Sequence, residues 1–327
     1  FLYFIEVNST PQHTMGGDHA QEKYDLAYYT KSAIAGGICC GITHSAMCPL
    51  DVVKTRIQLD SARYNKGMIG TLRQVVSEEG VGALATGLGP TAVGYFVQGW
   101  FKFGGVEFFK INFAQALGDE TAWKYRTGIY LLSSACAEFI ADIFLCPLEA
   151  TRIRLVSQPD FAPGLLTAFP KIVKTDGILR GFYSGFGPIL LKQVPYTMAK
   201  FAVQGLAAEG IFNALSIDVK TASESTKTTV SLASGLIAGV AAAVVSHPAD
   251  TLLSMINKSP TAGGTGSIPS RLANLAKETG LKRLCLTGLG PRCVMIGVLT
   301  AGQFGIFDVI MTATGASKFH FHEPKHQ

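Results

Sequence analysis

A short motif of a proline followed by an acidic residue occurs three times in the chain, at intervals of about 100 residues. The acid lies two positions after the proline, and in the first two copies a base follows three positions later. The copies are Pro49-Leu50-Asp51-Val52-Val53-Lys54, Pro147-Leu148-Glu149-Ala150-Thr151-Arg152 and Pro248-Ala249-Asp250-Thr251-Leu252-Leu253. Regular internal repetition is the signature of a repeated structural unit, so the 327-residue chain is expected to contain three equivalent units.

A second motif, Gly-x-Gly-Pro, recurs in phase with the first and marks the later half of each unit. Its copies are Gly87-Leu88-Gly89-Pro90, Gly185-Phe186-Gly187-Pro188 and Gly288-Leu289-Gly290-Pro291. Two independent motifs with the same period strengthen the assignment of three units. We place the units at 24–119, 120–222 and 223–318, between a flexible N-terminal tail, 1–23, and a solvated C-terminal tail, 319–327.

Long apolar runs indicate that the units cross a membrane. Residues 32–50 and 81–101 contain no acidic residue, lysine or arginine, and about 20 such residues span a bilayer core. Charged residues make up 16% of the chain, against about 25% in typical soluble domains. We therefore predict an all-α membrane protein with six transmembrane helices in three pseudo-symmetric repeats, each with two spanning helices and a short helix between them. A soluble helical repeat array is the alternative.

Small residues spaced four apart predict close contacts between these helices. Gly36 and Cys40 form such a pair in the first unit, and Gly235 and Gly239 form one in the third. Small residues let helix backbones approach each other in lipid. In the second unit Glu138 occupies the equivalent position, where a carboxylate replaces a small side chain.

Composition argues against several functional classes. The net charge of +5 is spread along the chain and does not form a nucleic-acid footprint. The seven cysteines lack metal-site spacing, so a packing role is favoured, although metal transport through them stays open. We find no phosphate-binding loop, metal cluster or nucleophile–base pair, and therefore expect no enzyme activity, cofactor or bound metal.

Three polar residues occupy equivalent positions in the second helix of each unit. Lys102, Lys200 and Gln303 each lie twelve residues after the Gly-x-Gly-Pro proline, and a phenylalanine follows each of them. Equivalent positions in symmetric helices share one depth, where two ammonium groups and an amide suit an anion. Lys192 lies about 12 Å from Lys200 along the same helix. Charged groups inside membrane helices usually face a water-filled cavity, and snorkelling to a lipid headgroup is the alternative.

The motif set resembles the mitochondrial carrier family and, within it, the phosphate carriers. The narrower likeness rests on 43–45, 51–58, 98–105, 146–159 and 248–253. The resemblance implies six tilted helices around a pseudo-threefold axis in the inner mitochondrial membrane, with the short helices in the matrix. It also implies one central site, open to either side alternately, which imports inorganic phosphate with a proton or in exchange for hydroxide.

Titratable residues on the first and third helices fit proton coupling. Glu138, Asp142 and Glu149 are spaced to share one helix face, and His44 lies seven residues before Asp51. An imidazole and buried carboxylates can pass a proton along a path. The resemblance assigns proton coupling to His44, Glu138 and Glu149, and a packing histidine is the alternative for His44. The candidate substrate site comprises Lys102, Lys192, Lys200, Gln303, Thr91, Tyr95 and Gln193.

The resemblance also assigns two gates. Pro49, Pro147 and Pro248 are expected to kink their helices, and the charges beyond them to form a matrix gate. Its expected pairs are Asp51 with Arg152 and Asp250 with Lys54. Glu149 would face Leu253, lack a basic partner and be available for a proton; a bond to a neighbouring backbone or hydroxyl group is the alternative.

At the other gate, many carriers have an aromatic-acid-x-x-base motif. Here only the first unit has both charges, Glu107 and Lys110, and the third has Asp308 alone. Neither charge of the first unit has an obvious partner, so we expect a weak outer gate. Expected partners are phosphate, protons and membrane lipid such as cardiolipin, with ATP synthase or a nucleotide carrier as candidate associates. The rival functions are transport of another anion by the same fold, proton leak, and a structural or regulatory role in a membrane pore.

Overall fold

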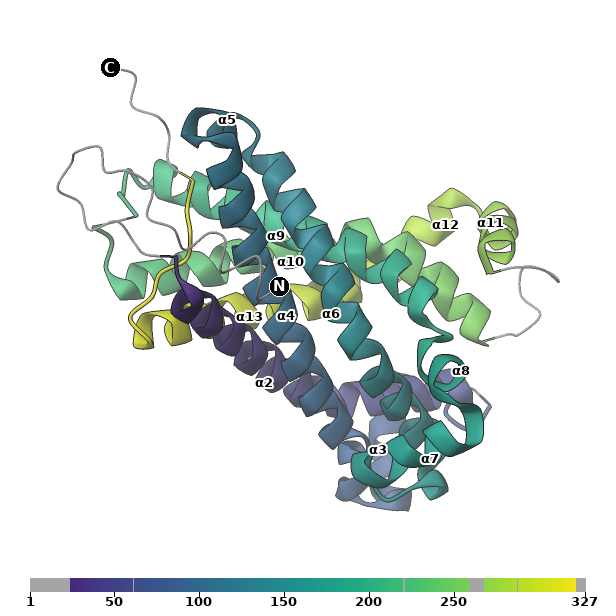
Figure 1. Ribbon diagram of the computed structural model, residues 1–327. Helices are drawn as coiled ribbons and strands as arrows, with labels where there is room; N and C mark the ends of the chain where they lie inside the picture. Colours follow the sequence, from purple (N-terminus) through teal and green to yellow (C-terminus); the bar gives the residue numbers. More distant parts are fainter. Residues whose placement is uncertain (1–23, 61, 220, 259–267, 287, 322–327) are drawn as a thin grey trace.

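The computed structural model describes residues 24–60, 62–219, 221–258, 268–286 and 288–321 (Figure 1). Six long helices dominate these residues: α2 (Leu26–Leu59), α4 (Leu88–Leu117), α6 (Arg126–Ser157), α9 (Phe186–Ala214), α10 (Glu224–Lys258) and α13 (Leu289–Ala313). Short helices join the two long helices of each pair: α3 (Gly67–Glu79) and η1 (Val81–Ala85); η2 (Pro159–Phe161), α7 (Leu165–Asp176) and α8 (Ile178–Tyr183); α11 (Ile268–Thr279) and α12 (Leu281–Leu286). The helix α5 (Asp119–Lys124) joins the first pair to the second. The predicted N-terminal tail and most of the predicted C-terminal tail lie outside the described residues.

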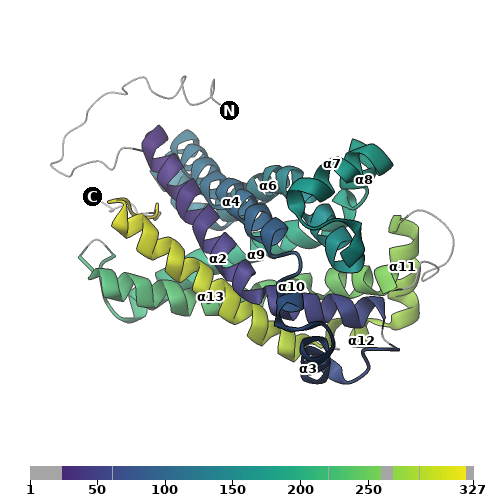
Figure 2. The same cartoon turned by 90° about the horizontal axis from the view of Figure 1, so that it is seen from below.

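The six long helices form a closed ring. Each packs against the next in chain order, and α13 returns to pack against α2. The short helices α3, α7, α8, α11 and α12 lie together at one end of the ring, and the segment after α13 lies at the other (Figures 1 and 2). We call these the connector end and the terminal end. The predicted architecture of three helix pairs, each with a short connecting helix, is confirmed.

The six predicted spanning helices correspond to the six long helices, which differ in how apolar they are. Four helices are long and apolar enough to cross a membrane by length and composition, and a fifth span qualifies if the bent pair α3 with η1–α4 is counted as one. Within the described residues α9 does not qualify. This helix carries Lys192, Gln193, Thr197 and Lys200, which lower its hydropathy. The helix α9 is less apolar than its neighbours because it contributes polar side chains to the site described below.

The motif prolines lie inside helices rather than at their ends. Pro49 is within α2, Pro147 within α6 and Pro248 within α10. Proline removes one helical hydrogen bond and crowds the preceding turn, which favours a bend. Figure 2 shows α2 changing direction part-way along its length. Bends at the other two prolines stay a prediction.

Glycines bring the two helices of a pair into contact, as predicted for the first and third units. A methyl group added to Gly36 would lie 2.5 Å from the carbonyl oxygen of Gly99, and one added to Gly99 would lie 2.2 Å from that of Gly36. Between α10 and α13, a methyl group on Gly239 would lie 2.6 Å from the carbonyl oxygen of Ile296. The backbones at these crossings leave no room for a side chain.

We predict that Gly99→Ala destabilises the protein because its new methyl group meets backbone rather than a movable side chain. Overpacking of this kind costs about 1–3 kcal/mol, so the thermal unfolding midpoint in detergent should fall by several degrees. Gly89→Ala is the matched control. It lies on the same helix, and a methyl group there meets nothing within 4 Å. Equal midpoints for the two variants would refute the close crossing of α2 and α4.

Candidate functional site

A buried ion pair occupies the centre of the ring. Nζ of Lys102, on α4, lies 2.9 Å from Oε2 of Glu138, on α6, and the two side chains are 5% and 0% exposed. The hydroxyl of Thr197 donates to the same carboxylate oxygen at 2.8 Å, and Nε2 of Gln98 donates to Oε1 at 3.0 Å. The carboxylate thus has three partners from two neighbouring helices, α4 and α9, and a buried charge requires such partners.

A second carboxyl group shares the amide of Gln98. Nε2 of Gln98 lies 3.5 Å from Oδ1 of Asp142, which is one turn from Glu138 on α6 and fully buried. The side-chain amide therefore contacts two acidic groups at once.

Lys200 lies in an aromatic surround and contacts a neutral side chain. Its ammonium donates to Oε1 of Gln303 on α13. It also lies 4.9 Å from the ring centre of Phe103, 5.4 Å from Phe201 and 5.2 Å from Phe304, distances at which cation–π attraction operates. Within the described residues no carboxylate lies within ion-pair distance of Lys200. It is the lysine at this depth whose charge is not matched by a direct ion pair.

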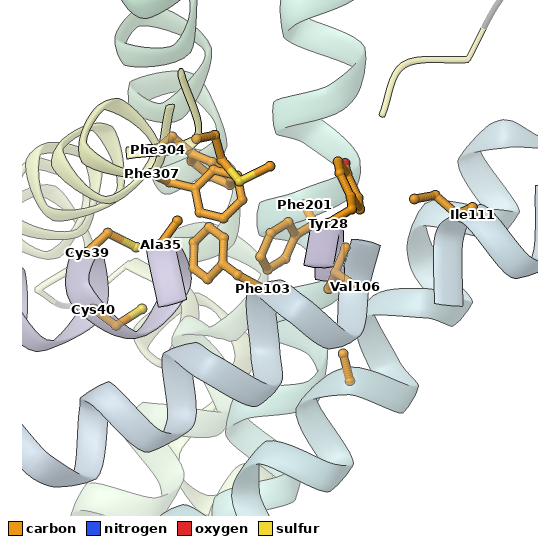
Figure 3. Close-up of a cluster of buried hydrophobic side chains, with 12 residues drawn as sticks. Tyr28, Ala35, Cys39, Cys40, Phe103, Val106, Ile111, Phe201, Phe304 and Phe307 are labelled. Carbon is orange, nitrogen blue, oxygen red and sulfur yellow. The ribbon is translucent and has the colours of Figure 1, made fainter. Parts of the chain in front are cut away.

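The phenylalanines after the three equivalent residues meet at the centre of the ring (Figure 3). The ring centres of Phe103 and Phe201 are 5.0 Å apart, those of Phe103 and Phe304 are 5.6 Å apart, and those of Phe201 and Phe304 are 5.5 Å apart. The prediction that Lys102, Lys200 and Gln303 share one depth is therefore confirmed by the convergence of their neighbours.

Two further predicted residues lie together nearer the connector end. The rings of His44 on α2 and Tyr95 on α4 are stacked, with centres 3.6 Å apart and planes 6° from parallel. Thr91, one turn before Tyr95, is buried and donates its hydroxyl hydrogen to the carbonyl oxygen of Gly87. Gln193 is partly buried on α9. The roles of these four residues stay predictions.

The gate charges pair as predicted between the first and second units. Nη2 of Arg152 lies 2.7 Å from Oδ2 of Asp51. The same guanidinium reaches Glu149, with Nη1 3.1 Å from Oε1. The prediction that Glu149 lacks a basic partner was wrong. Arg152 lies one turn beyond Glu149 on α6, so one fork of donors serves both acids.

The third acid of the gate pairs differently from the prediction. Asp250 forms ion pairs with Arg292 on α13 and, at 3.4 Å, with Lys192 on α9. Lys54 is exposed, and among the described residues it forms no ion pair with Asp250. The predicted Asp250–Lys54 pair was therefore wrong, because α9 and α13 bring nearer cations. Lys192 accordingly lies at the gate, with its side chain 39% exposed, rather than in the central layer.

Three residues that the sequence interpretation did not assign have central positions. Gln98 lies four residues before Lys102, and Thr197 three before Lys200. One-turn spacing from an assigned residue was the signal that could have identified both. Arg292 directly follows the third Gly-x-Gly-Pro motif, where its proximity to the gate was not apparent from the motif alone.

The whole length of this ring matches a known family. A family model described as mitochondrial carrier protein matches residues 26–116, 124–213 and 224–317. The chain belongs to the mitochondrial carrier family. It is therefore a mitochondrial membrane transporter and not an enzyme, as predicted.

Carriers from distant organisms are similar over nearly the full chain. "Mitochondrial substrate carrier family protein N" of Dictyostelium discoideum is 49% identical over 88% of this chain and 95% of its own. "Phosphate carrier protein, mitochondrial" of Caenorhabditis elegans is 42% identical over 88% of this chain and 81% of its own. "Mitochondrial phosphate carrier protein 2, mitochondrial" of Arabidopsis thaliana is 40% identical over 90% of this chain and 78% of its own.

Proposed function

We propose that this carrier moves inorganic phosphate across the inner mitochondrial membrane together with a proton, or equivalently in exchange for hydroxide. The observation that supports the proposal most strongly is the buried Lys102–Glu138 pair beside Lys200. The similarity to proteins named phosphate carriers supports the choice of substrate.

Lys102 can bind a phosphate oxygen only by exchanging its present partner. The ammonium of Lys102 is matched by Glu138. An arriving anion competes for that ammonium, and a buried carboxylate left without its cation costs several kcal/mol. Protonation of Glu138 removes this cost. Phosphate binding and proton uptake are linked in this way, which is the requirement for symport.

Lys200 supplies the attraction that draws the anion to this depth. Its charge faces an amide and three aromatic rings rather than a carboxylate, so its interaction with an anion requires no ion pair to break. The amide of Gln303 can then donate to a phosphate oxygen, because its NH₂ group is distinct from the Oε1 that Lys200 contacts. The two lysines therefore have different roles, one in attraction and one in coupling.

The nearby pair of Glu138 and Asp142 provides a reservoir for the proton. Both carboxyl groups contact the amide of Gln98, so a proton on one can move to the other without leaving the buried layer. His44, stacked on Tyr95, extends the titratable groups toward the connector end. Arg152 and Asp250, with their ion-pair partners, supply the charges of the gate at that end.

Phosphate uptake into proteoliposomes under an imposed pH step tests the proposal. Purified carrier is reconstituted, and radiolabelled phosphate is added outside vesicles with an alkaline interior. Symport with one proton predicts accumulation that changes about tenfold for each pH unit and vanishes with a protonophore. Exchange of ATP for ADP without phosphate uptake would refute the proposal and favour another anion carrier.

A further inference from the structure

The chain beyond α13 turns back and lies across the terminal end of the ring. Lys318 anchors it to two helices. Its Nζ lies 3.2 Å from Oδ1 of Asp308 on α13 and donates to the hydroxyl of Ser231 on α10 at 2.9 Å. The same ammonium lies 5.4 Å from the ring centre of Phe307. The side chain is 10% exposed, so these contacts are sheltered from bulk water.

Phe319 anchors the segment to the first helix pair through its backbone. Its N–H donates to Oε2 of Glu107 at 3.2 Å, and its carbonyl oxygen accepts from Nζ of Lys110 at 3.2 Å. Its ring meets the ring of Tyr24, with centres 5.6 Å apart. Glu107 and Lys110 also pair with each other, and the hydroxyl of Tyr28 donates to Glu107. The prediction that these two charges lack partners was wrong.

Phe321 extends the contact to the second helix pair. It is 7% exposed, and its ring centre lies 5.3 Å from that of Tyr130 on α6. The prediction of a solvated tail from residue 319 is therefore wrong for 319–321. Three positions of one short segment, 318, 319 and 321, thus contact α4, α6, α10 and α13 as well as Tyr24, just before α2.

This segment and the phenylalanine layer line one pocket. Its lining includes the rings of Phe103, Phe201 and Phe304 together with Lys318 and Phe319. Nζ of Lys318 lies 5.7 Å from the ring centre of Phe304, and Lys200 contacts the same three rings. The segment therefore lies against the phenylalanine layer that the central lysine Lys200 also contacts.

The charges of the long helices alone do not close this end. Among 88–117, 186–214 and 289–313, the gate positions hold Glu107, Lys110, Gln204 and Asp308. Lys110, the one base among them, pairs with Glu107 on its own helix, and within the described residues Asp308 forms no ion pair with it. Lys318 supplies a base for Asp308 from beyond α13.

We propose that residues 316–321 complete the gate at the terminal end of this carrier, with Lys318 as the missing basic residue and Phe319 as the tie to the first repeat. Release of the segment accompanies opening of this end. The inference requires that the chain is a carrier but does not depend on which anion it transports.

The test measures access to a buried thiol next to the phenylalanine layer. Cys39 is fully buried and belongs to the same cluster as Phe103 and Phe304 (Figure 3). A variant that keeps only this cysteine is reconstituted and treated outside with a membrane-impermeant methanethiosulfonate reagent. Labelling of a second variant, with Lys227→Cys as its single cysteine, reports the fraction of molecules whose terminal end faces the reagent.

Lys318→Met is expected to accelerate Cys39 labelling at least about fivefold, the change that corresponds to the upper end of the range for loss of an exposed ion pair. Phe319→Ala should act in the same direction through different contacts. Lys227→Met is the matched control, because Lys227 pairs with Glu224 at 2.9 Å on α10 but touches no part of 316–321 in any described contact; it should leave the rate unchanged.

Two results would overturn the proposal. One is parental labelling rates in both Lys318→Met and Phe319→Ala. The other is equal acceleration at Cys285, at the connector end, measured in a further variant that keeps only Cys285 and in the molecules whose connector end faces the reagent, because that would show general loosening rather than opening of one gate. If the parent protein does not transport phosphate, the proposed substrate is contradicted. The labelling result and its interpretation are not affected by that outcome.

Discussion

Lys200→Gln should reduce phosphate uptake by one to two orders of magnitude. The substitution removes the ammonium that faces Gln303 and three aromatic rings, and leaves a neutral amide of similar reach. A hydrogen bond to a charged group contributes about 1.5–3 kcal/mol, and every 1.4 kcal/mol corresponds to about tenfold in affinity. The measurement is the initial rate of labelled phosphate uptake as a function of phosphate concentration.

The loss should be one of affinity for substrate and not of folding. Replacing a buried charge by a neutral side chain is often neutral or stabilising, so the unfolding midpoint of Lys200→Gln should stay near that of the parent. Lys171→Gln is the matched control, because Lys171 is exposed on α7 and contacts only the carbonyl of Phe161 and its ring among the described contacts. Uptake by Lys200→Gln within twofold of the parent would remove Lys200 from the substrate site.

Lys200 also shows what sequence symmetry can and cannot determine. Counting from the Gly-x-Gly-Pro motifs placed Lys102, Lys200 and Gln303 at one depth, because three helices of equal geometry rise by the same amount per residue. The depth of a residue can be predicted by counting from the motif, but its contact partners cannot. Lys102 pairs with a carboxylate, whereas Lys200 contacts aromatic rings. The difference arises because only the second repeat has a glutamate, Glu138, where the other repeats have a small residue.

The gate pairs illustrate a second limit. The Asp51–Arg152 pair agrees with the order of the repeats, whereas Asp250 pairs with Arg292 and Lys192 instead of Lys54. Long basic side chains reach several angstroms, so the choice among them depends on the rotation and tilt of neighbouring helices. Motif spacing contains neither quantity.

The segment after α13 shows how position in the chain can mislead. The last residues of a domain are commonly solvated, and the sequence analysis predicts a solvated tail over 319–327. Phe319 and Phe321 nevertheless bury their rings against Tyr24 and Tyr130. Two aromatic residues separated by one position can anchor an extended chain, but only the folded ring of helices supplies the surface that receives them.

Glu138→Gln should separate phosphate binding from proton coupling. The amide resembles a protonated carboxyl group in shape and, like it, can both donate and accept hydrogen bonds, but it cannot release a proton. Lys102 would lose its ion pair and stand ready for the anion at every pH. We therefore expect phosphate–phosphate exchange to persist. Net uptake driven by an alkaline interior should fall below that of the parent protein by at least about tenfold for each pH unit imposed.

Two assays on the same vesicles distinguish coupling from simple inactivation. Exchange is measured with phosphate on both sides and no pH difference, and net uptake is measured with an empty alkaline interior. Glu209→Gln is the matched control, because Glu209 is also on a long helix but pairs with Arg126, 3.1 Å away, outside the central layer. It should leave the ratio of the two rates unchanged.

The decisive quantity is that ratio. If Glu138→Gln retains both activities, the proton is carried by another group, and Asp142 becomes the first to examine because it shares the amide of Gln98. If both activities are lost together, Glu138 supports the position of Lys102 rather than proton transfer. Only exchange without pH-driven uptake agrees with a carboxylate that releases its lysine when it binds a proton.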